Sequence, residues 1–237
     1  MNSDAAASGA LPKYEDLAGL IEYTLVRADL SEEDVARGCE LAKSYRVAAV
    51  VVRPCDVEVA ARWMAGSEVR IGAILDIPHG YSTTGAKLYA ARDLLRRGVH
   101  QIDTVLNTGK LISRQFQYLE MELVQMAEAV HESGASLAIQ LESEYLTEEL
   151  KIVACRIARR AGAEYIGSNR AEDLPLFQAH SRERLKLKSQ AAAGSLDAVL
   201  ALRDAGCSRI QLSDPAAILD AWKQKLAALT PPAATAS

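Results

Sequence analysis

The sequence predicts an α/β fold, a single-domain (β/α)8 TIM barrel. Eight short apolar runs alternate with longer amphipathic stretches over 237 residues, which is the pattern of repeated strand–helix units. A glycine in a small-residue turn precedes three of these runs, as expected at helix-to-strand junctions, at positions 97–100, 160–164 and 204–207. A doubly wound open sheet is the alternative. No G-x-G-x-x-G or G-x-x-x-x-G-K-[ST] motif follows the first run, which disfavours the nucleotide-binding versions of that fold.

The predicted strands are apolar runs too short for most helices. They are Leu20–Leu25, Ala48–Val52, Val69–Ile77, Gln101–Leu106, Ser136–Glu142, Tyr165–Ser168, Leu185–Ser189 and Arg209–Leu212. Aromatic residues make up only 5% of the chain, so aliphatic side chains are expected to fill the core.

The predicted helices are identified by their period and by their end signals. Ser31 precedes three acidic residues. A serine can cap the start of a helix, and negative charge in the first turn stabilises that end. The segment Thr84–Gly98 has a helical period and ends in glycine, as many helices do. Further helices are expected over 113–134, 147–162, 195–206 and 214–229.

Composition indicates one soluble domain over residues 13–229, with flexible tails at 1–12 and 230–237. The chain is 49% hydrophobic and 24% charged, and its net charge of -4 disfavours a nucleic-acid partner. We expect no signal peptide and no membrane span. The four cysteines are widely spaced, which is typical of reduced thiols in a cytoplasmic protein.

The strongest hint of chemistry is the pair Lys186 and Lys188 on the seventh predicted strand. Residues two apart share one face of a strand, so both amines would enter the barrel interior. Crowding and burial lower the pKa of a lysine, and a neutral amine is a nucleophile. The alternative is structural: one amine pairs with Glu142 or Asp103, or both reach water through their long stems.

In such a barrel the functional residues lie where strands end. Asp103 has the inward parity of Lys188 and is a candidate for moving protons or for balancing its charge. Candidate substrate-binding residues at the same end are Glu22, Thr24, Arg53, Asn107, Glu142 and Ser168. Arg53 could recognise a carboxylate or pair with Asp76. The four histidines lack ligand spacing, so we expect no metal and no other cofactor.

Ile21-Glu-Tyr-Thr-Leu25 is similar to the motif "IDHTLL", and Gln101-Ile-Asp-Thr-Val-Leu-Asn-Thr-Gly109 is similar to the motif "EIDMVINIG". With these motifs the chain resembles the deoxyribose-phosphate aldolase family. The similarity extends to 48–54 ("AVCVNP"), 77–84 ("FPLGANTT") and 141–143 ("IET"), and it weakens after Gly162.

The resemblance implies a class I aldolase in which a lysine on strand six forms a Schiff base with the substrate. That position is Gly167 here, and a further family lysine on strand five falls on Ala138. The strand-seven lysine that tunes the reaction corresponds to Lys188, and the strand-four aspartate that helps move protons corresponds to Asp103.

The family's two phosphate-binding loops are also altered. They correspond to Ala192-Ala-Gly-Ser195 and Gln211-Leu-Ser-Asp-Pro215. Phosphate sites use glycine-rich backbone at a helix N-terminus without a competing anion. Asp214 would itself cap such a terminus, so a phosphorylated substrate held in the family's manner is disfavoured.

Two functions are therefore open. One is an aldehyde-lyase that uses Lys188 or Lys186 on a small aldehyde or sugar-like substrate, with ordinary deoxyribose-phosphate cleavage weak or absent. The other is a catalytically inactive homologue that binds a metabolite or a partner. Barrels of this kind often pair through their outer helices, so a homodimer is an assembly to test.

Overall fold

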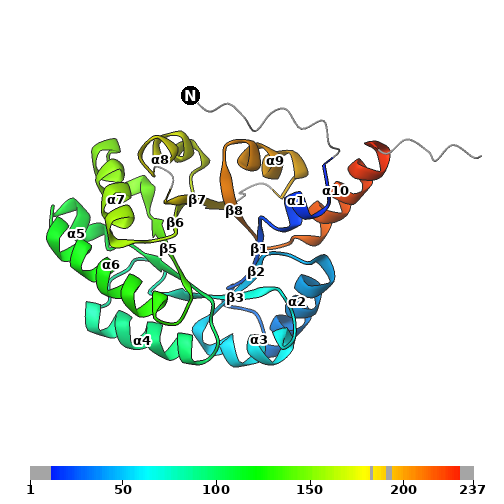
Figure 1. The fold of residues 1–237 in the computed structure, drawn as a ribbon, viewed down its shortest axis with the longest axis horizontal. Helices are drawn as coiled ribbons and strands as arrows, with labels where there is room; N and C mark the ends of the chain where they lie inside the picture. Colours follow the sequence, from blue (N-terminus) through cyan, green and yellow to red (C-terminus); the bar gives the residue numbers. More distant parts are fainter. Residues whose placement is uncertain (1–11, 182–183, 191–193, 230–237) are drawn as a thin grey trace, which may run out of the picture.

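The chain forms a closed barrel of eight parallel strands surrounded by helices (Figure 1). The computed structural model describes residues 12–181, 184–190 and 194–229. Each strand pairs with the next in sequence, and β1 pairs with β8 to close the sheet. The predicted barrel is confirmed. The predicted tails, apart from Pro12, lie outside the described residues.

All eight predicted strands are present to within a few residues. They are β1 (Ile21–Leu25), β2 (Ala49–Val52), β3 (Arg70–Leu75), β4 (Gln101–Val105), β5 (Ser136–Leu141), β6 (Tyr165–Ser168), β7 (Lys186–Gln190) and β8 (Cys207–Leu212). The helices are α1 (Glu15–Ala18), α2 (Glu32–Tyr45), α3 (Val57–Met64), α4 (Thr84–Arg96), α5 (Thr108–Ile112), α6 (Phe116–His131), α7 (Glu148–Ala161), α8 (Leu174–Ser181), α9 (Leu196–Asp204) and α10 (Ala216–Leu229). Short 3-10 turns span Pro54–Asp56, Ser143–Tyr145 and Ala171–Asp173.

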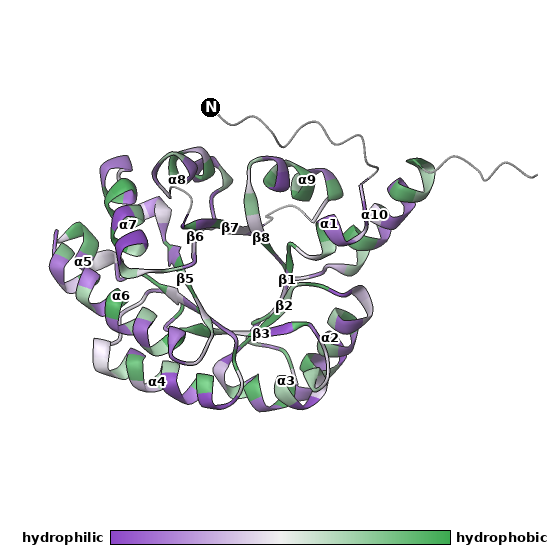
Figure 2. Ribbon diagram, viewed as in Figure 1, coloured by the Kyte–Doolittle hydropathy of each residue, from purple (hydrophilic) through white to green (hydrophobic). Residues whose placement is uncertain are grey.

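The core lies mainly between the barrel and its helices. Every residue of β2 is buried, which explains why this strand is a continuous apolar run rather than an alternating one. The helices carry both hydrophobic and hydrophilic residues (Figure 2), and each helix contributes apolar residues to the buried core. Most buried side chains are aliphatic, with Tyr165, Phe177 and Trp222 as the large aromatic exceptions.

The predicted helix starts reflect real caps. Ser31 forms a capping box with Asp34, and Thr147 and Ser195 accept backbone N–H groups at the starts of α7 and α9. The predicted start of the helix after β4 is wrong by three residues. A separate short helix, α5, precedes α6, and Arg114 between them has a φ of 55°, a left-handed conformation that interrupts the helix.

The cysteines are free thiols, and three of the four are buried. Burial raises the pKa of Cys39 and Cys207 to about 11 and that of Cys155 to about 12, so these thiols are unreactive at neutral pH. Across the described ranges no helix is both long enough and apolar enough to span a bilayer.

Candidate functional site

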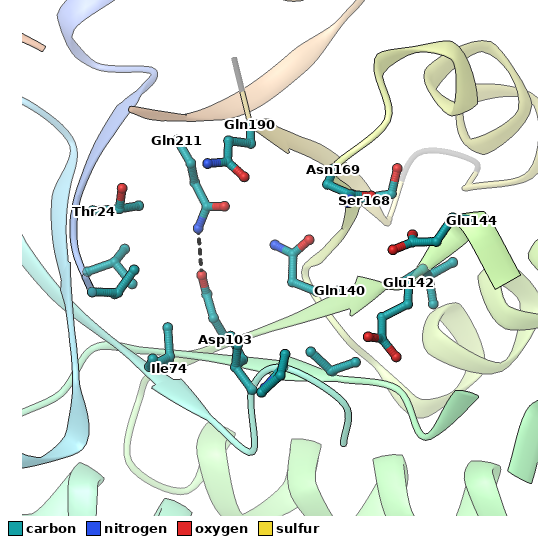
Figure 3. Close-up of a pocket in the computed structure, with 16 residues that line it drawn as sticks. Thr24, Ile74, Asp103, Gln140, Glu142, Glu144, Ser168, Asn169, Gln190 and Gln211 are labelled. Atoms are coloured by element: carbon teal, nitrogen blue, oxygen red, sulfur yellow. Dashed lines mark hydrogen bonds between the residues drawn. The ribbon is translucent and has the colours of Figure 1, made fainter. Parts of the chain in front are cut away.

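A cavity of about 400 Å³ opens at the carboxyl ends of the strands, where barrel enzymes place their sites (Figure 3). Its lining is rich in oxygen and amide groups. The polar lining residues are Thr24, Asp103, Gln140, Glu142, Glu144, Ser168, Asn169, Gln190 and Gln211, and the apolar ones are Val26, Val51, Ile74, Ile77, Pro78, Val105 and Leu141. No lysine or arginine from the described part of the chain lines it.

A buried ion cluster lies at the inner end of this cavity. Lys188 Nζ lies 2.6 Å from Asp103 Oδ2 and 2.5 Å from Glu22 Oε2, and all three residues are fully buried. Two carboxylates therefore face one ammonium group. Arg209 adds a second positive charge, and its interaction with Glu22 is weaker because Arg209 Nε lies 3.7 Å from Glu22 Oε1. A buried charge needs such partners to offset the loss of water.

The prediction of a lowered pKa at Lys188 is wrong. Burial by itself favours the neutral amine, but the Asp103 and Glu22 carboxylates outweigh it and raise the pKa of Lys188. Burial raises the pKa of Asp103, and Glu22 adds to this effect while Lys188 opposes it. The amine is thus held as an ammonium ion, which is not a nucleophile.

The prediction that Lys186 and Lys188 share a confined space is also wrong. Lys186 is exposed at the start of β7, and its Nζ lies 6.0 Å from the centre of the Tyr165 ring. The two lysines share a face of the strand, but two residues of strand advance the chain by about 6.6 Å. This shift places Lys186 at the amino end of the barrel and Lys188 at its centre.

Two glutamines complete the cluster, and sequence analysis missed both. Gln101 Nε2 donates to Asp103 Oδ1 at 2.9 Å and to Glu22 Oε1 at 3.0 Å. Gln211 Nε2 donates to Asp103 Oδ2 at 3.0 Å (Figure 3). Gln101 precedes Asp103 by two residues on the same strand face, so its inward direction could have been inferred from parity alone.

Gly167 lies where the backbone of the neighbouring strand approaches closely. A Cβ atom at this position would lie 2.3 Å from the carbonyl oxygen of Lys188 and 3.0 Å from Gln140 Oε1. The backbone carbonyl of β7 cannot give way as a flexible side chain would. The present arrangement of β6 and β7 therefore accepts only glycine here.

Three of the six predicted substrate-binding residues line the cavity: Thr24, Glu142 and Ser168. The other three do not. Glu22 is fully buried in the ion cluster, and Asn107 caps α5 by accepting the N–H of Lys110 at 3.0 Å.

Arg53 holds the loop after β1 instead of facing a ligand. Its Nε pairs with Asp56 at 2.5 Å, and its other nitrogens donate to the carbonyls of Arg27, Ala28 and Leu30 at 2.9–3.3 Å. Asp76, the partner considered from sequence, accepts from Ser82 instead. These contacts use the guanidinium donors that an anionic ligand would need.

His79 contacts Glu142, one of the residues that line the cavity. Its Nδ1 lies 2.6 Å from Glu142 Oε1, and Thr108 donates to Glu142 Oε2 at 3.1 Å. The ring also stacks on Tyr81 at a centroid distance of 4.8 Å. The contact joins the loop after β3 to the end of β5, a pairing across 63 residues that no local pattern predicts.

The N-termini of α9 and α10 are capped by the chain's own side chains. The Asp214 carboxylate accepts the N–H of Ala216 at 3.2 Å, and Ser195 accepts the N–H of Ala198 at 3.2 Å. Residues 191–193, which include the start of the first altered loop, lie outside the described residues. Among the residues that are described, no three His, Cys, Asp or Glu side chains converge as a metal site requires.

No protein-family model matches the chain. Curated relatives do. The chain is 32% identical over 212 residues to the deoxyribose-phosphate aldolase of Treponema denticola, covering 86% of this chain and 98% of that protein. It is 31% identical over 218 residues to the enzyme of the same name from Methanothermobacter thermautotrophicus, covering 88% and 96%.

Solved structures show the same fold at lower identity. One, described as a putative deoxyribose-phosphate aldolase from Coccidioides immitis, has a TM-score of 0.84 at 21% identity and covers 90% of this chain and 88% of its own. Another is described as a tetrameric deoxyribose phosphate aldolase from Aeropyrum pernix, with a TM-score of 0.82 at 20% identity, covering 90% and 93%.

Proposed function

Since the chain belongs to the deoxyribose-phosphate aldolase family, we propose that it binds a small, unphosphorylated, oxygen-rich molecule in the cavity and cleaves deoxyribose 5-phosphate weakly or not at all. One observation carries this proposal. The cavity ends on Asp103, but the lysine beside that aspartate is buried and ion-paired. In addition, the family resemblance implies a covalent lysine at the position where this chain has Gly167.

Aldol cleavage leaves an electron pair on carbon, which an iminium ion or a Lewis acid must accept. Formation of an iminium requires a neutral amine. Lys188 is held as an ammonium ion between two carboxylates. Asp103 by itself offers general acid–base help, worth about 10²–10⁴-fold, whereas enzymes reach at least about 10⁶-fold.

The charges of the cavity favour a neutral ligand. Its carboxylates, Asp103, Glu142 and Glu144, would repel a phosphate group, and Asp214 already caps α10. Carboxylates accept hydrogen bonds from hydroxyl groups, and the cavity's carboxamides both donate and accept them. A molecule with several hydroxyl groups suits this lining.

An aldehyde-lyase that acts through Lys188 is the second candidate. The supporting observation is the 2.6 Å contact between Lys188 Nζ and Asp103, which itself lines the cavity. Such chemistry would require the amine to leave both carboxylates, lose its proton and reach the ligand. Lys186 is a weaker candidate, because it is exposed at the other end of the barrel.

A coupled assay with 2-deoxyribose 5-phosphate tests the first proposal, with a family enzyme assayed alongside. We expect turnover at least about 10²-fold below that enzyme. Turnover within tenfold of it, abolished in a folded Lys188→Met variant, would instead establish Lys188 as the working amine.

Borohydride trapping separates the two candidates directly. The protein is incubated with acetaldehyde or glyceraldehyde, reduced, digested and analysed by peptide mass spectrometry. We expect no adduct on Lys188, with the modified lysine assigned from fragment ions, while exposed lysines elsewhere in the chain such as Lys225 provide an internal measure of nonspecific labelling. A stoichiometric Lys188 adduct that forms faster than any surface adduct would contradict the binding-only proposal. The homodimer stays a prediction, which light scattering after size-exclusion chromatography would check.

A further inference from the structure

We infer that Gln140 recognises a carbonyl oxygen of the ligand, donating a hydrogen bond where family members place a covalent lysine. This inference rests on the proposed function, because it assigns a donor within the same cavity. It narrows the ligand class to small hydroxy-carbonyl compounds.

The position of Gln140 follows from the barrel register. Gln140 on β5 is paired with Gly167 on β6. Its Oε1 lies 3.0 Å from the point where a Cβ at Gly167 would stand, so the carboxamide occupies space that a longer side chain at 167 would otherwise enter. The glycine at position 167 and the orientation of the Gln140 side chain therefore depend on each other.

The nitrogen end of the carboxamide has no partner in the protein. Gln140 Nε2 is buried from solvent and makes no hydrogen bond in the structure. Figure 3 shows the nitrogen end of this side chain turned toward the middle of the cavity. A buried donor without an acceptor is unfavourable, so a ligand oxygen at this point would remove a penalty as well as add a contact.

The neighbouring groups define what else the ligand carries. Asp103 and Glu142 line the same cavity and can only accept hydrogen bonds when ionised, which suits hydroxyl groups. Gln140 supplies the donor that a carbonyl oxygen requires, because a carbonyl oxygen cannot donate. One carbonyl flanked by hydroxyl groups satisfies both kinds of partner.

Erythrulose and erythritol provide a matched pair of probes, since they share a carbon skeleton and differ at the carbonyl. Binding is measured by ligand-observed NMR titration of the full chain. We expect the wild type to prefer erythrulose, and Gln140→Leu to weaken erythrulose binding about two- to tenfold while leaving erythritol unchanged. Gln140→Glu keeps an acceptor but no donor, and it should weaken erythrulose binding at least as much.

Gln125→Leu is the matched control, because Gln125 is exposed on α6 and does not line the cavity. It should bind like the wild type. Gln140→Leu should also melt at the same or a higher temperature than the wild type, since it removes an unsatisfied buried group.

The outcomes separate this inference from the proposed function. If the wild type binds both probes equally, or if Gln140→Leu or Gln140→Glu binds erythrulose as tightly as the wild type, the role of Gln140 is refuted while ligand binding stands. If the wild type binds neither probe, the proposed function fails and this inference fails with it.

Discussion

Replacing Lys188 by methionine tests the account of the ion cluster. Methionine has a similar length but no charge, so the change leaves Asp103 and Glu22 buried opposite each other without their ammonium partner. Removing one member of a buried ion pair destabilises a protein by about 3–5 kcal/mol. In a domain of this size each kcal/mol lowers the melting temperature by about 2–4 °C, so a decrease of about 6–20 °C is expected.

The pH dependence of this deficit has a definite sign. Burial and the Glu22 charge raise the pKa of Asp103 even with the lysine present, and removal of the lysine raises it further. A carboxyl group whose folded pKa is raised lowers stability above its unfolded pKa, near 3.9, and this loss disappears as the pH falls toward that value. The variant should therefore lie closest to the wild type at acidic pH.

Urea unfolding of the wild type and of Lys188→Met at pH 7 and pH 5 measures both effects. A second variant, which adds Glu22→Gln and Asp103→Asn to Lys188→Met, removes all three charges and should recover most of the lost stability. A loss below about 1 kcal/mol at pH 7, or a loss that is equal at both pH values, would refute the view that Lys188 neutralises two buried carboxylates.

Two further predictions concern the backbone near the site. Gly167→Ala should destabilise the chain by about 1–3 kcal/mol in urea unfolding, because its Cβ would meet the Lys188 carbonyl. Gly85→Ala, which has open space around it, should be neutral or slightly stabilising. Equal effects of the two variants would contradict the close approach at Gly167. Arg53→Met should lower the free energy of unfolding by about 1–3 kcal/mol, because it removes the contacts to Asp56 and to the β1–α2 loop. The affinity for erythrulose should change by no more than about twofold. A selective loss of ligand binding would show that Arg53 contacts the ligand.

Much of the barrel is determined locally. Strands such as β2 could be predicted because parallel strands that are buried on both faces favour continuous apolar runs. Several helix starts could be predicted because Ser31, Thr147 and Ser195 satisfy backbone groups within their own turn. The break before α6 could not, since it depends on one residue adopting a left-handed conformation that many sequences avoid.

For the site, strand parity and family resemblance were enough to place Asp103 and Lys188 together. Parity could not distinguish Lys188 from Lys186, because depth along the barrel axis depends on the stagger between strands. It also could not give the direction of the Lys188 pKa, which depends on Glu22 reaching the same amine from the opposite part of the chain.

The sequence by itself determined a parallel barrel with a glycine at position 167 of the sixth strand, because apolar periodicity and residue identity are local properties. Only the tertiary structure decided what surrounds that position: the β7 carbonyl that excludes a side chain at Gly167, the carboxamide of Gln140 beside it, and the His79–Glu142 pair at the cavity edge. These contacts join residues from different strands and loops, and their distances are set by how the barrel closes.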